Sequence, residues 1–150
     1  MKLGEGTYGR VTFGIEMFTK NPVVIKLLKY GSKDKTGEIE KNVLVQLNKN
    51  SVLPKLYDLL EYDPNHKYLI TSLHGPNLQK LEIFCHHHKF SRKTIYKIGI
   101  GLFKYIEFLH EVNYLHLDLK QDNILWLFEP IKINNNTLDF ILIDFGFSIF

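Results

Sequence analysis

The sequence predicts an α+β fold, in which a strand-rich first half carrying one helix precedes a second half built around a long helix. Short runs of β-branched and aromatic residues occupy much of residues 10–29 and 55–72, and such runs are typical of strands. Between residues 91 and 111, apolar side chains recur every three or four positions, which is the period of a helix. Strands and helices therefore fall into largely separate blocks along the chain.

The first two predicted strands form a hairpin. Apolar and polar side chains alternate over residues 10–16, and residues 22–29 form an apolar, β-branched run that contains Lys26. Residues 19–22 between them read Thr-Lys-Asn-Pro, which is turn chemistry. We expect the glycine-rich segment 4–9 to lie at the mouth of this hairpin.

A helix and two further strands complete the first half. Residues 36–48 are predicted to form an amphipathic helix, with Thr36 or Asp34 as its N-cap. Its apolar positions are Ile39, Val43, Leu44 and Leu47. Strands are predicted over residues 55–62 and 68–72, on either side of a turn at residues 63–66.

The second half begins after Gly75-Pro76-Asn77, where the composition changes. We expect a short helix over residues 78–86 and a long helix over residues 91–111, capped by Ser91. The apolar stripe of the long helix is Ile95, Ile98, Leu102, Ile106 and Leu109. Short strands are predicted over residues 124–128 and 138–143, with the polar residues 131–136 at a hairpin tip.

Composition excludes several classes of function. With 19 basic and 16 acidic residues, the charge is too balanced for nucleic acid or an anionic membrane to be the main partner. The sequence has one cysteine, Cys85, which forms no internal disulfide, and no apolar run reaches the roughly 18 residues of a membrane helix. The N-terminus shows no secretory signal, so we expect a cytoplasmic or nuclear protein. Oligomeric state cannot be inferred from the sequence.

Four motifs follow one another along the chain. They are Gly4-x-Gly6-x-x-Gly9, Val23-Val24-Ile25-Lys26, His116-Leu117-Asp118 with Asn123 after it, and Asp144-Phe145-Gly146. In this order the motifs resemble those of a eukaryotic protein kinase, over residues 3–146. The resemblance implies a protein kinase-like fold, with the small lobe and hinge in about residues 1–74 and the start of an incomplete large lobe in about residues 75–150.

The resemblance also implies an activity. It indicates an ATP-dependent serine/threonine kinase that uses Mg²⁺ and acts on a Ser or Thr hydroxyl of a protein substrate. Asp118 would accept the hydroxyl proton, and Lys120 would steady the transferring phosphoryl group. Asn123 and Asp144 would hold Mg²⁺, because hard cations prefer oxygen ligands.

Lys26 is expected to contact phosphate oxygens and to pair with a carboxylate of the following helix. An ammonium group on an apolar strand is costly without such a partner. Glu40 is the expected partner because it lies beside the inward face of the helix, and Glu38 is the competing assignment.

The remaining nucleotide-binding residues are implied by the resemblance. Glycines at positions 4, 6 and 9 would let the backbone approach the phosphates, with residue 71 as gatekeeper and residues 72–74 as the hinge that reads adenine. The full set is Leu3, Gly4, Glu5, Gly6, Thr7, Tyr8, Gly9, Arg10, Val11, Val24, Lys26, Thr71, Ser72, His74, Leu125 and Ile143.

Segments 72–78 and 90–95 are similar to those of the casein kinase I group, and two positions depart from the general kinase pattern. Leu117 replaces an arginine that docks phosphorylated activation segments, so control by such phosphorylation is not expected. Val24 replaces an alanine and adds bulk above the adenine, which would weaken nucleotide binding modestly.

The chain is shorter than the two-lobed domain that the resemblance implies. With 150 residues it is expected to be a fragment or a truncated kinase, with little turnover by itself. Two alternatives stay open at this point: a kinase-like module that binds nucleotide or a partner without turnover, and a small-molecule phosphotransferase that shares the chemistry of Asp118 and Asn123.

Overall fold

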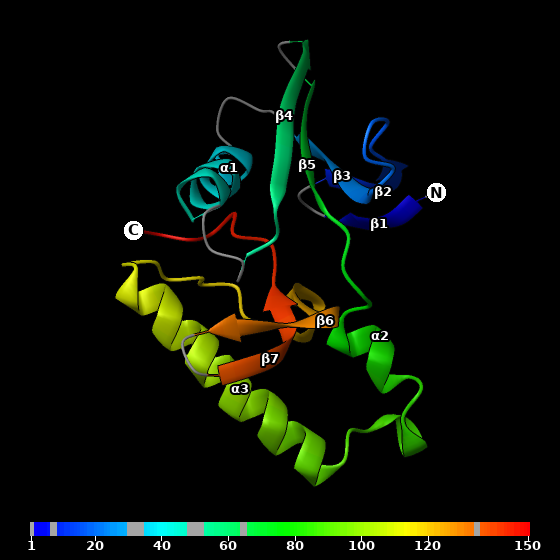
Figure 1. Cartoon of the computed structure of the whole chain (residues 1–150), viewed down its shortest axis with the longest axis vertical. Coiled ribbons are helices and arrows are strands. Elements are labelled where there is room, and N and C mark those ends of the chain that lie inside the picture. The colour runs from blue at the N-terminus through cyan, green and yellow to red at the C-terminus, as the bar shows by residue number, and fades with distance from the viewer. Residues whose placement is uncertain (1, 7–8, 30–34, 48–52, 64–65, 134–135) are drawn as a thin grey trace. The chain divides into compact units, whose positions relative to one another are not determined.

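The computed structural model describes residues 2–6, 9–29, 35–47, 53–63, 66–133 and 136–150. The chain divides into two compact units, Met1–Leu73 and His74–Phe150, which are described separately below (Figure 1). The first unit combines an antiparallel sheet with one helix, and the second combines helices with a two-stranded sheet. The predicted α+β fold is confirmed.

The first unit is built on a five-stranded antiparallel sheet with the strand order β1-β2-β3-β5-β4. Its strands are β1 Lys2–Gly6, β2 Gly9–Ile15, β3 Pro22–Lys29, β4 Leu56–Asp63 and β5 His66–Ser72. The predicted β2–β3 hairpin is confirmed. Strand β1 was not predicted, because two of its five residues are glycines, which have low β propensity. It pairs with β2, and at Gly6 and Gly9 only backbone groups are available for this pairing. The glycine-rich segment therefore spans the β1–β2 connection.

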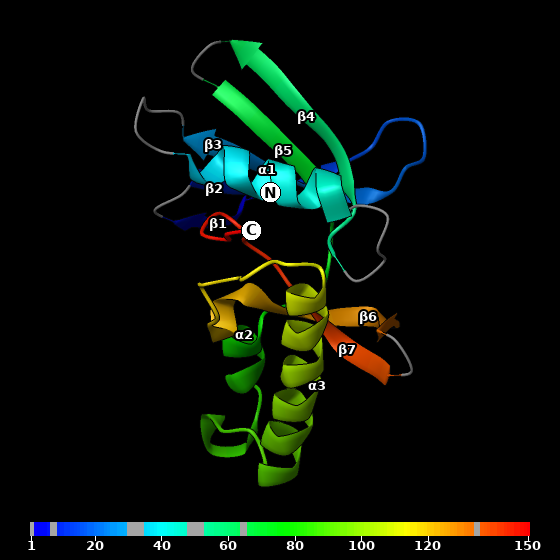
Figure 2. The ribbon, with the colours of Figure 1, turned by 90° about the vertical axis from the view of Figure 1, so that its left-hand side faces the viewer.

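Helix α1, Thr36–Leu47, lies against one face of this sheet (Figure 2). Its buried residues are Glu40, Val43, Leu44 and Leu47, while Ile39 is half-buried. Glu40 therefore lies on the inward face of α1 itself, and not beside that face as the apolar residues indicated. Thr36 is the first helical residue and not the cap, and Asp34 lies outside the described residues.

The second unit contains α2 Leu78–Glu82, α3 Arg92–Glu111, and a hairpin of β6 Ile124–Ile133 and β7 Asn136–Leu142. The predicted helix over 78–86 is too long: after Glu82 the backbone makes tighter i to i+3 bonds, and a short 3₁₀ turn follows at His86–His88. The hairpin strands are longer than predicted, because an irregularity between Trp126 and Ile131 accommodates the Glu129-Pro130 pair within β6. Residues 131–133 therefore belong to the strand and not to the tip.

Side-chain caps begin both helices of this unit. The Asn77 side chain accepts a hydrogen bond from the backbone N–H of Lys80 at 2.8 Å, and Ser91 accepts one from Thr94 at 3.1 Å. The predicted cap at Ser91 is thus confirmed. Among the described residues, no helix has both the length and the apolar character needed to cross a membrane.

Helix α3 packs on the β6–β7 hairpin through a glycine. Its buried residues are Gly101, Tyr105 and Leu109, whereas Ile95, predicted to be in the apolar stripe, is 55% exposed. The predicted stripe was wrong in part because the hairpin fits against the smallest residue of the helix. A Cβ atom on Gly101 would come within 2.9 Å of the Phe140 ring. Burial raises the pKa of the Tyr105 hydroxyl, which is hydrogen-bonded to the backbone of Leu142.

Two glycines of α3 provide a matched test of this packing. No described atom lies within 4 Å of a Cβ built on Gly99, whereas one built on Gly101 meets the Phe140 and Leu138 side chains. We expect Gly99→Ala to stabilise the protein by about 0.5–1 kcal/mol through helix propensity. Gly101→Ala should instead lose about 1–2 kcal/mol to overpacking. Urea denaturation followed by circular dichroism measures both, and equal stabilisation by the two variants would contradict the packing described.

Candidate active site

In the first unit, Lys26 and Glu40 form a close ion pair. Lys26 Nζ on β3 lies 2.6 Å from Glu40 Oε2 on α1, with side chains only 15% and 8% exposed. Glu40 can reach the lysine because it lies on the buried face of α1, whereas Glu38, two positions earlier, is exposed. The structure thus brings Lys26 together with Glu40 and not with Glu38.

The glycine-rich segment is described only in part. Gly4, Glu5 and Gly6 lie on β1, and Gly9, Arg10 and Val11 begin β2, while Thr7 and Tyr8 lie outside the described residues. No atom of the described residues lies within 4 Å of a Cβ built on Gly4, and its φ is not in the left-handed region. Among the residues that the structure describes, neither packing nor backbone conformation therefore requires glycine at position 4.

In the second unit, the carboxylate of Asp118 is held through one of its oxygens. Lys120 Nζ lies 2.6 Å from Asp118 Oδ2, and Asn123 Nδ2 donates to the same oxygen at 2.9 Å. Among the described residues, Asp118 Oδ1 receives no hydrogen bond. Burial acts to raise the pKa of Asp118, but the hydrogen bonds from Lys120 and Asn123 outweigh it and hold the pKa below its usual range. At neutral pH the group is an anion with one oxygen open.

His116 is buried, and its two ring nitrogens have different roles. Nδ1 accepts the backbone N–H of Asp118 at 3.3 Å, so the proton of a neutral ring lies on Nε2, which donates to the carbonyl of Ile143 at 3.0 Å. The Phe145 ring packs beside it, with ring centroids 4.8 Å apart. Burial lowers the pKa of His116, against the opposing effects of the Ile143 carbonyl and of the Asp118 and Asp144 charges.

These bonds close into a ring of four residues. His116 donates to Ile143, the Ile143 N–H donates to the Asn123 carbonyl at 3.0 Å, Asn123 donates to Asp118, and Asp118 donates back to His116. We call this set, His116, Ile143, Asn123 and Asp118, the loop ring. It joins the segment before β6 to the segment after β7.

Asp144 follows Ile143, a member of the loop ring, and has a left-handed backbone with φ of 65°. Leu117, between His116 and Asp118, has φ of 60°. An L residue with a side chain is strained in this region unless the surroundings hold it there. The bonds of His116 and Asp118 on either side of Leu117 supply that restraint. Asn123 uses its Nδ2 on the backbone oxygen and carboxylate of Asp118, which leaves its Oδ1 as a potential metal ligand. The backbone carbonyl of Asn123 accepts a hydrogen bond from Ile143, the residue before Asp144.

The remaining predicted residues form partly buried surfaces within each unit. Val24 on β3 pairs directly with Thr71 on β5, so both side chains lie on one side of the sheet. The other predicted residues, all half-buried, are Leu3, Val11 and Ser72 in the first unit and His74, Leu125 and Ile143 in the second. Burial lowers the pKa of His74.

Sequence reasoning missed the structural role of His116 and of the Ile143 carbonyl. His116 was named only as part of a motif, and Ile143 only as an apolar side chain. The Ser148 hydroxyl, whose oxygen lies 3.5 Å from the His116 carbonyl, was also missed. A histidine between apolar residues signals a buried hydrogen-bonded group, but the sequence does not reveal which carbonyl it meets.

Comparison with known families adds one finding. The family model described as protein kinase domain matches residues 1–150, which is the whole chain.

The Lys26–Glu40 pair can be tested with two glutamates of one helix. Glu40→Gln removes the carboxylate charge beside the Lys26 ammonium, and we expect it to lower the free energy of unfolding by about 2–4 kcal/mol. Glu38→Gln, at the exposed position of α1, should change it by less than about 0.5 kcal/mol. Adding Lys26→Met to Glu40→Gln should recover part of the loss, because the buried ammonium that has lost its carboxylate is then gone. Equal effects of the two glutamine variants in urea denaturation would refute the pairing.

The environment of His116 predicts a pH dependence. Because burial lowers the pKa of His116 below the ordinary value of 6.5, the unfolded chain takes up this proton at a higher pH than the folded protein does. The stability contributed by neutral His116 is therefore complete above about pH 7 and falls as the pH drops below 6.5, by about 1 kcal/mol over one pH unit. His116→Gln should flatten this dependence by about one proton, and His110→Gln, at an exposed site on α3, is the control. Parallel curves for wild type and His116→Gln between pH 7.5 and 5.5 would count against a buried neutral ring.

Proposed function

The chain belongs to the protein kinase domain family, and from that premise we propose that it is an ATP-dependent serine/threonine kinase. Family membership gives the general class: a transferase that acts on protein substrates. The proposal adds the phosphoryl donor, the metal ion and the acceptor hydroxyl. Each is supported by the chemistry of particular side chains.

The geometry of Asp118 is the observation that carries the proposal. Oδ2 is anchored by Lys120 and Asn123, so the carboxylate cannot turn freely, and Oδ1 is left to accept a hydrogen bond. In the proposed step, a Ser or Thr hydroxyl oxygen forms a bond to the γ-phosphorus, and the bond from phosphorus to the β,γ-bridging oxygen breaks. ADP leaves with that electron pair, and the hydroxyl proton passes to Asp118.

Lys120 has a second role in this proposal. Its ammonium lies against Asp118 and its side chain is 44% exposed, so it can reach towards an incoming anion without leaving the loop. A cation there would stabilise the negative charge on the phosphoryl oxygens during transfer.

Asn123 and Asp144 supply the oxygen atoms that suit Mg²⁺. Asn123 Oδ1 and the carboxylate of Asp144 are hard donors, and Mg²⁺ in such sites is bound by one or two protein groups together with phosphates and water. When bound, the ion would neutralise charge on the β- and γ-phosphates. The loop ring fixes the side chain of Asn123, so this ligand needs no reorganisation.

In the first unit, we propose that Lys26 contacts nucleotide phosphates while Glu40 orients it. The Glu40 carboxylate holds the Lys26 ammonium at 2.6 Å, and phosphate oxygens are suitable acceptors for an ammonium group oriented in this way. Glycine at position 4 would let the backbone approach a phosphate closely, and none of the described residues gives another packing reason for a glycine there.

The casein kinase I-like subgroup is also a proposal, and it rests on segments 72–78 and 90–95 of the sequence. Two polar residues of these segments, Asn77 and Ser91, act as helix caps in the second unit. Their identity is therefore explained by local structure, and the subgroup proposal rests on the apolar and hinge positions around them.

A pair of variants tests nucleotide binding and phosphoryl transfer separately. We expect Mg²⁺ and ATP together to raise the melting temperature of the protein, and Lys26→Met to abolish the rise. Lys55→Met, at an exposed lysine of the same unit, is the control. Asp118→Asn should keep the rise but reduce transfer of labelled phosphate to casein by about 10²–10⁴-fold, because the proton acceptor is lost. Asp58→Asn, an exposed carboxylate, should leave transfer unchanged.

Each outcome has a separate meaning. No nucleotide-dependent stabilisation of the wild type would refute the nucleotide site. Stabilisation by nucleotide without any Asp118-dependent transfer would refute catalysis and leave a nucleotide-binding module. Phosphorylation confined to tyrosine would refute the proposed acceptor.

A further inference from the structure

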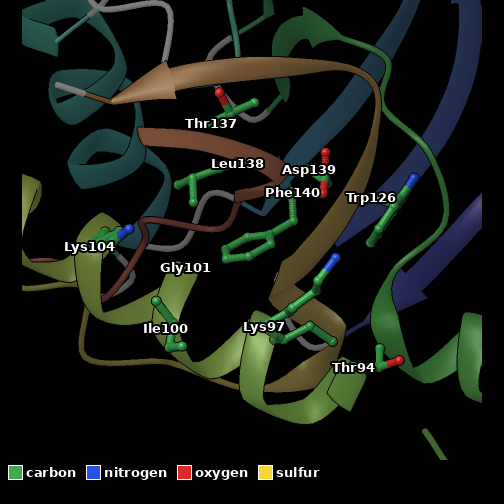
Figure 3. A pocket seen from close by; sticks show the side chains of 11 residues that line it. Thr94, Lys97, Ile100, Gly101, Lys104, Trp126, Thr137, Leu138, Asp139 and Phe140 are labelled. Atoms are coloured by element: carbon green, nitrogen blue, oxygen red, sulfur yellow. The ribbon is translucent and has the colours of Figure 1, made fainter. Parts of the chain in front are cut away.

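The second unit contains a cavity of about 440 Å³ between α3 and the β6–β7 hairpin (Figure 3). It has no part in the chemistry proposed above: none of the residues assigned there lines it. Its volume is in the range of sites that bind small molecules or the side chains of a peptide.

The floor and walls of the cavity are apolar. Phe140 and Leu138 form a buried floor against Gly101, and Trp126 and Ile100, which are 38% and 58% exposed, flank it. Large apolar side chains at this exposure offer contact area to a partner that enters the cavity.

The Trp126 wall is rigid because its backbone is bonded on both sides to an adjacent segment. The Trp126 N–H donates to the Pro76 carbonyl at 2.9 Å, and its carbonyl accepts from Gly75 at 2.8 Å. A Cβ on Gly75 would come within 2.7 Å of the Trp126 oxygen, so only glycine permits this approach. The cavity is thus preorganised on its tryptophan side, which reduces the entropy lost on binding.

Two lysines of α3 line the same cavity. Figure 3 shows the Phe140 ring between Lys97 and Lys104, which are seven residues apart on the helix and hence about 10 Å apart along its axis. Asp139 is the single carboxylate in the lining. The cavity therefore combines an apolar centre with two separated positive charges and a small net positive charge.

We propose that this cavity is a docking site for an acidic segment of a partner protein, in which two carboxylates flank an apolar side chain. Acidic residues about three positions apart in an extended peptide are separated by roughly 10 Å, which matches the spacing of the two lysines. The apolar residue between them packs against Trp126 and the Phe140 floor. Thr94 and Thr137, also in the lining, provide hydroxyls for the peptide backbone.

The charge pattern favours such a peptide over a nucleic acid. A phosphodiester strand places a negative charge on every nucleotide and is normally held by many cations. Here one carboxylate lies among two lysines, and the whole chain is nearly balanced, with 19 basic against 16 acidic residues. Two spaced carboxylates match the charge of the two lysines without bringing surplus negative charge against Asp139.

Trp126 reports on binding directly, because it is the only tryptophan in the sequence. The test is a fluorescence titration of the 150-residue chain with a short synthetic peptide that lacks tryptophan and carries two glutamates around a leucine. We expect a saturable change in Trp126 emission that weakens with added salt. Lys97→Ala and Lys104→Ala should each raise the dissociation constant about threefold to tenfold, whereas Lys93→Ala, an exposed lysine of α3 outside the lining, should leave it unchanged.

Controls separate this proposal from its competitors. A peptide with glutamines in place of the glutamates should bind at least about tenfold more weakly, and circular dichroism of the lysine variants should match the wild type. Equal binding of the neutral peptide, equal binding by a Lys97→Ala/Lys104→Ala double variant, or tighter lysine-dependent binding of single-stranded DNA would each overturn the proposal. Because the readout is binding alone, it is independent of nucleotide binding and of phosphoryl transfer.

Discussion

The loop ring is the constraint on which the rest of the second unit depends. The partly buried carboxylate of Asp118 and the buried imidazole of His116 both need hydrogen-bonding partners. Asn123 donates to the carboxylate, and the imidazole donates to the Ile143 carbonyl and accepts from the backbone N–H of Asp118. Because two of the four bonds involve the backbone of Ile143, the ring also fixes where the chain leaves β7 and enters Asp144-Phe145-Gly146. The proposed proton acceptor and metal ligands therefore owe their positions to one closed set of bonds, not to separate local contacts.

Much of the fold was predictable because it follows side-chain periodicity. Strand β3 and the N-cap of α3 were predicted at the observed residues, since β-branched runs and a serine before an apolar helix are local signals. Strand β1 was missed because glycines pair through backbone groups, and the exposure of Ile95 was missed because the helix packs through Gly101. Of the candidate site, Asp118, Asn123 and Lys26 were expected from the resemblance of their motifs to those of protein kinases. The Ile143 carbonyl and the left-handed backbone at Leu117 have no signature in residue type, so the loop ring could not be foreseen.

The β6 strand serves two surfaces with consecutive residues. Leu125 belongs to the predicted nucleotide-binding set, whereas Trp126, the next residue, lines the cavity beside α3. Successive side chains of a strand point to opposite faces, so one backbone carries both surfaces. The segment Gly75–Asn77 pairs with this part of β6, and the Asn77 amide also donates to Asp122 at 3.2 Å. A substitution in this segment would consequently alter the position of the cavity wall and of the loop that carries Asn123.

The left-handed backbone at Asp144 has a consequence for how substitutions at this position are interpreted. Among residues with a side chain, asparagine and aspartate tolerate this conformation best, whereas β-branched residues do so poorly. A survey of all replacements at Asp144 would therefore mix two effects: loss of a charged oxygen donor, and destabilisation of the left-handed backbone conformation at this position. Asparagine isolates the first effect, because it keeps the shape and removes the charge. Valine would combine both, so the failure of a valine variant would say little about the proposed metal binding.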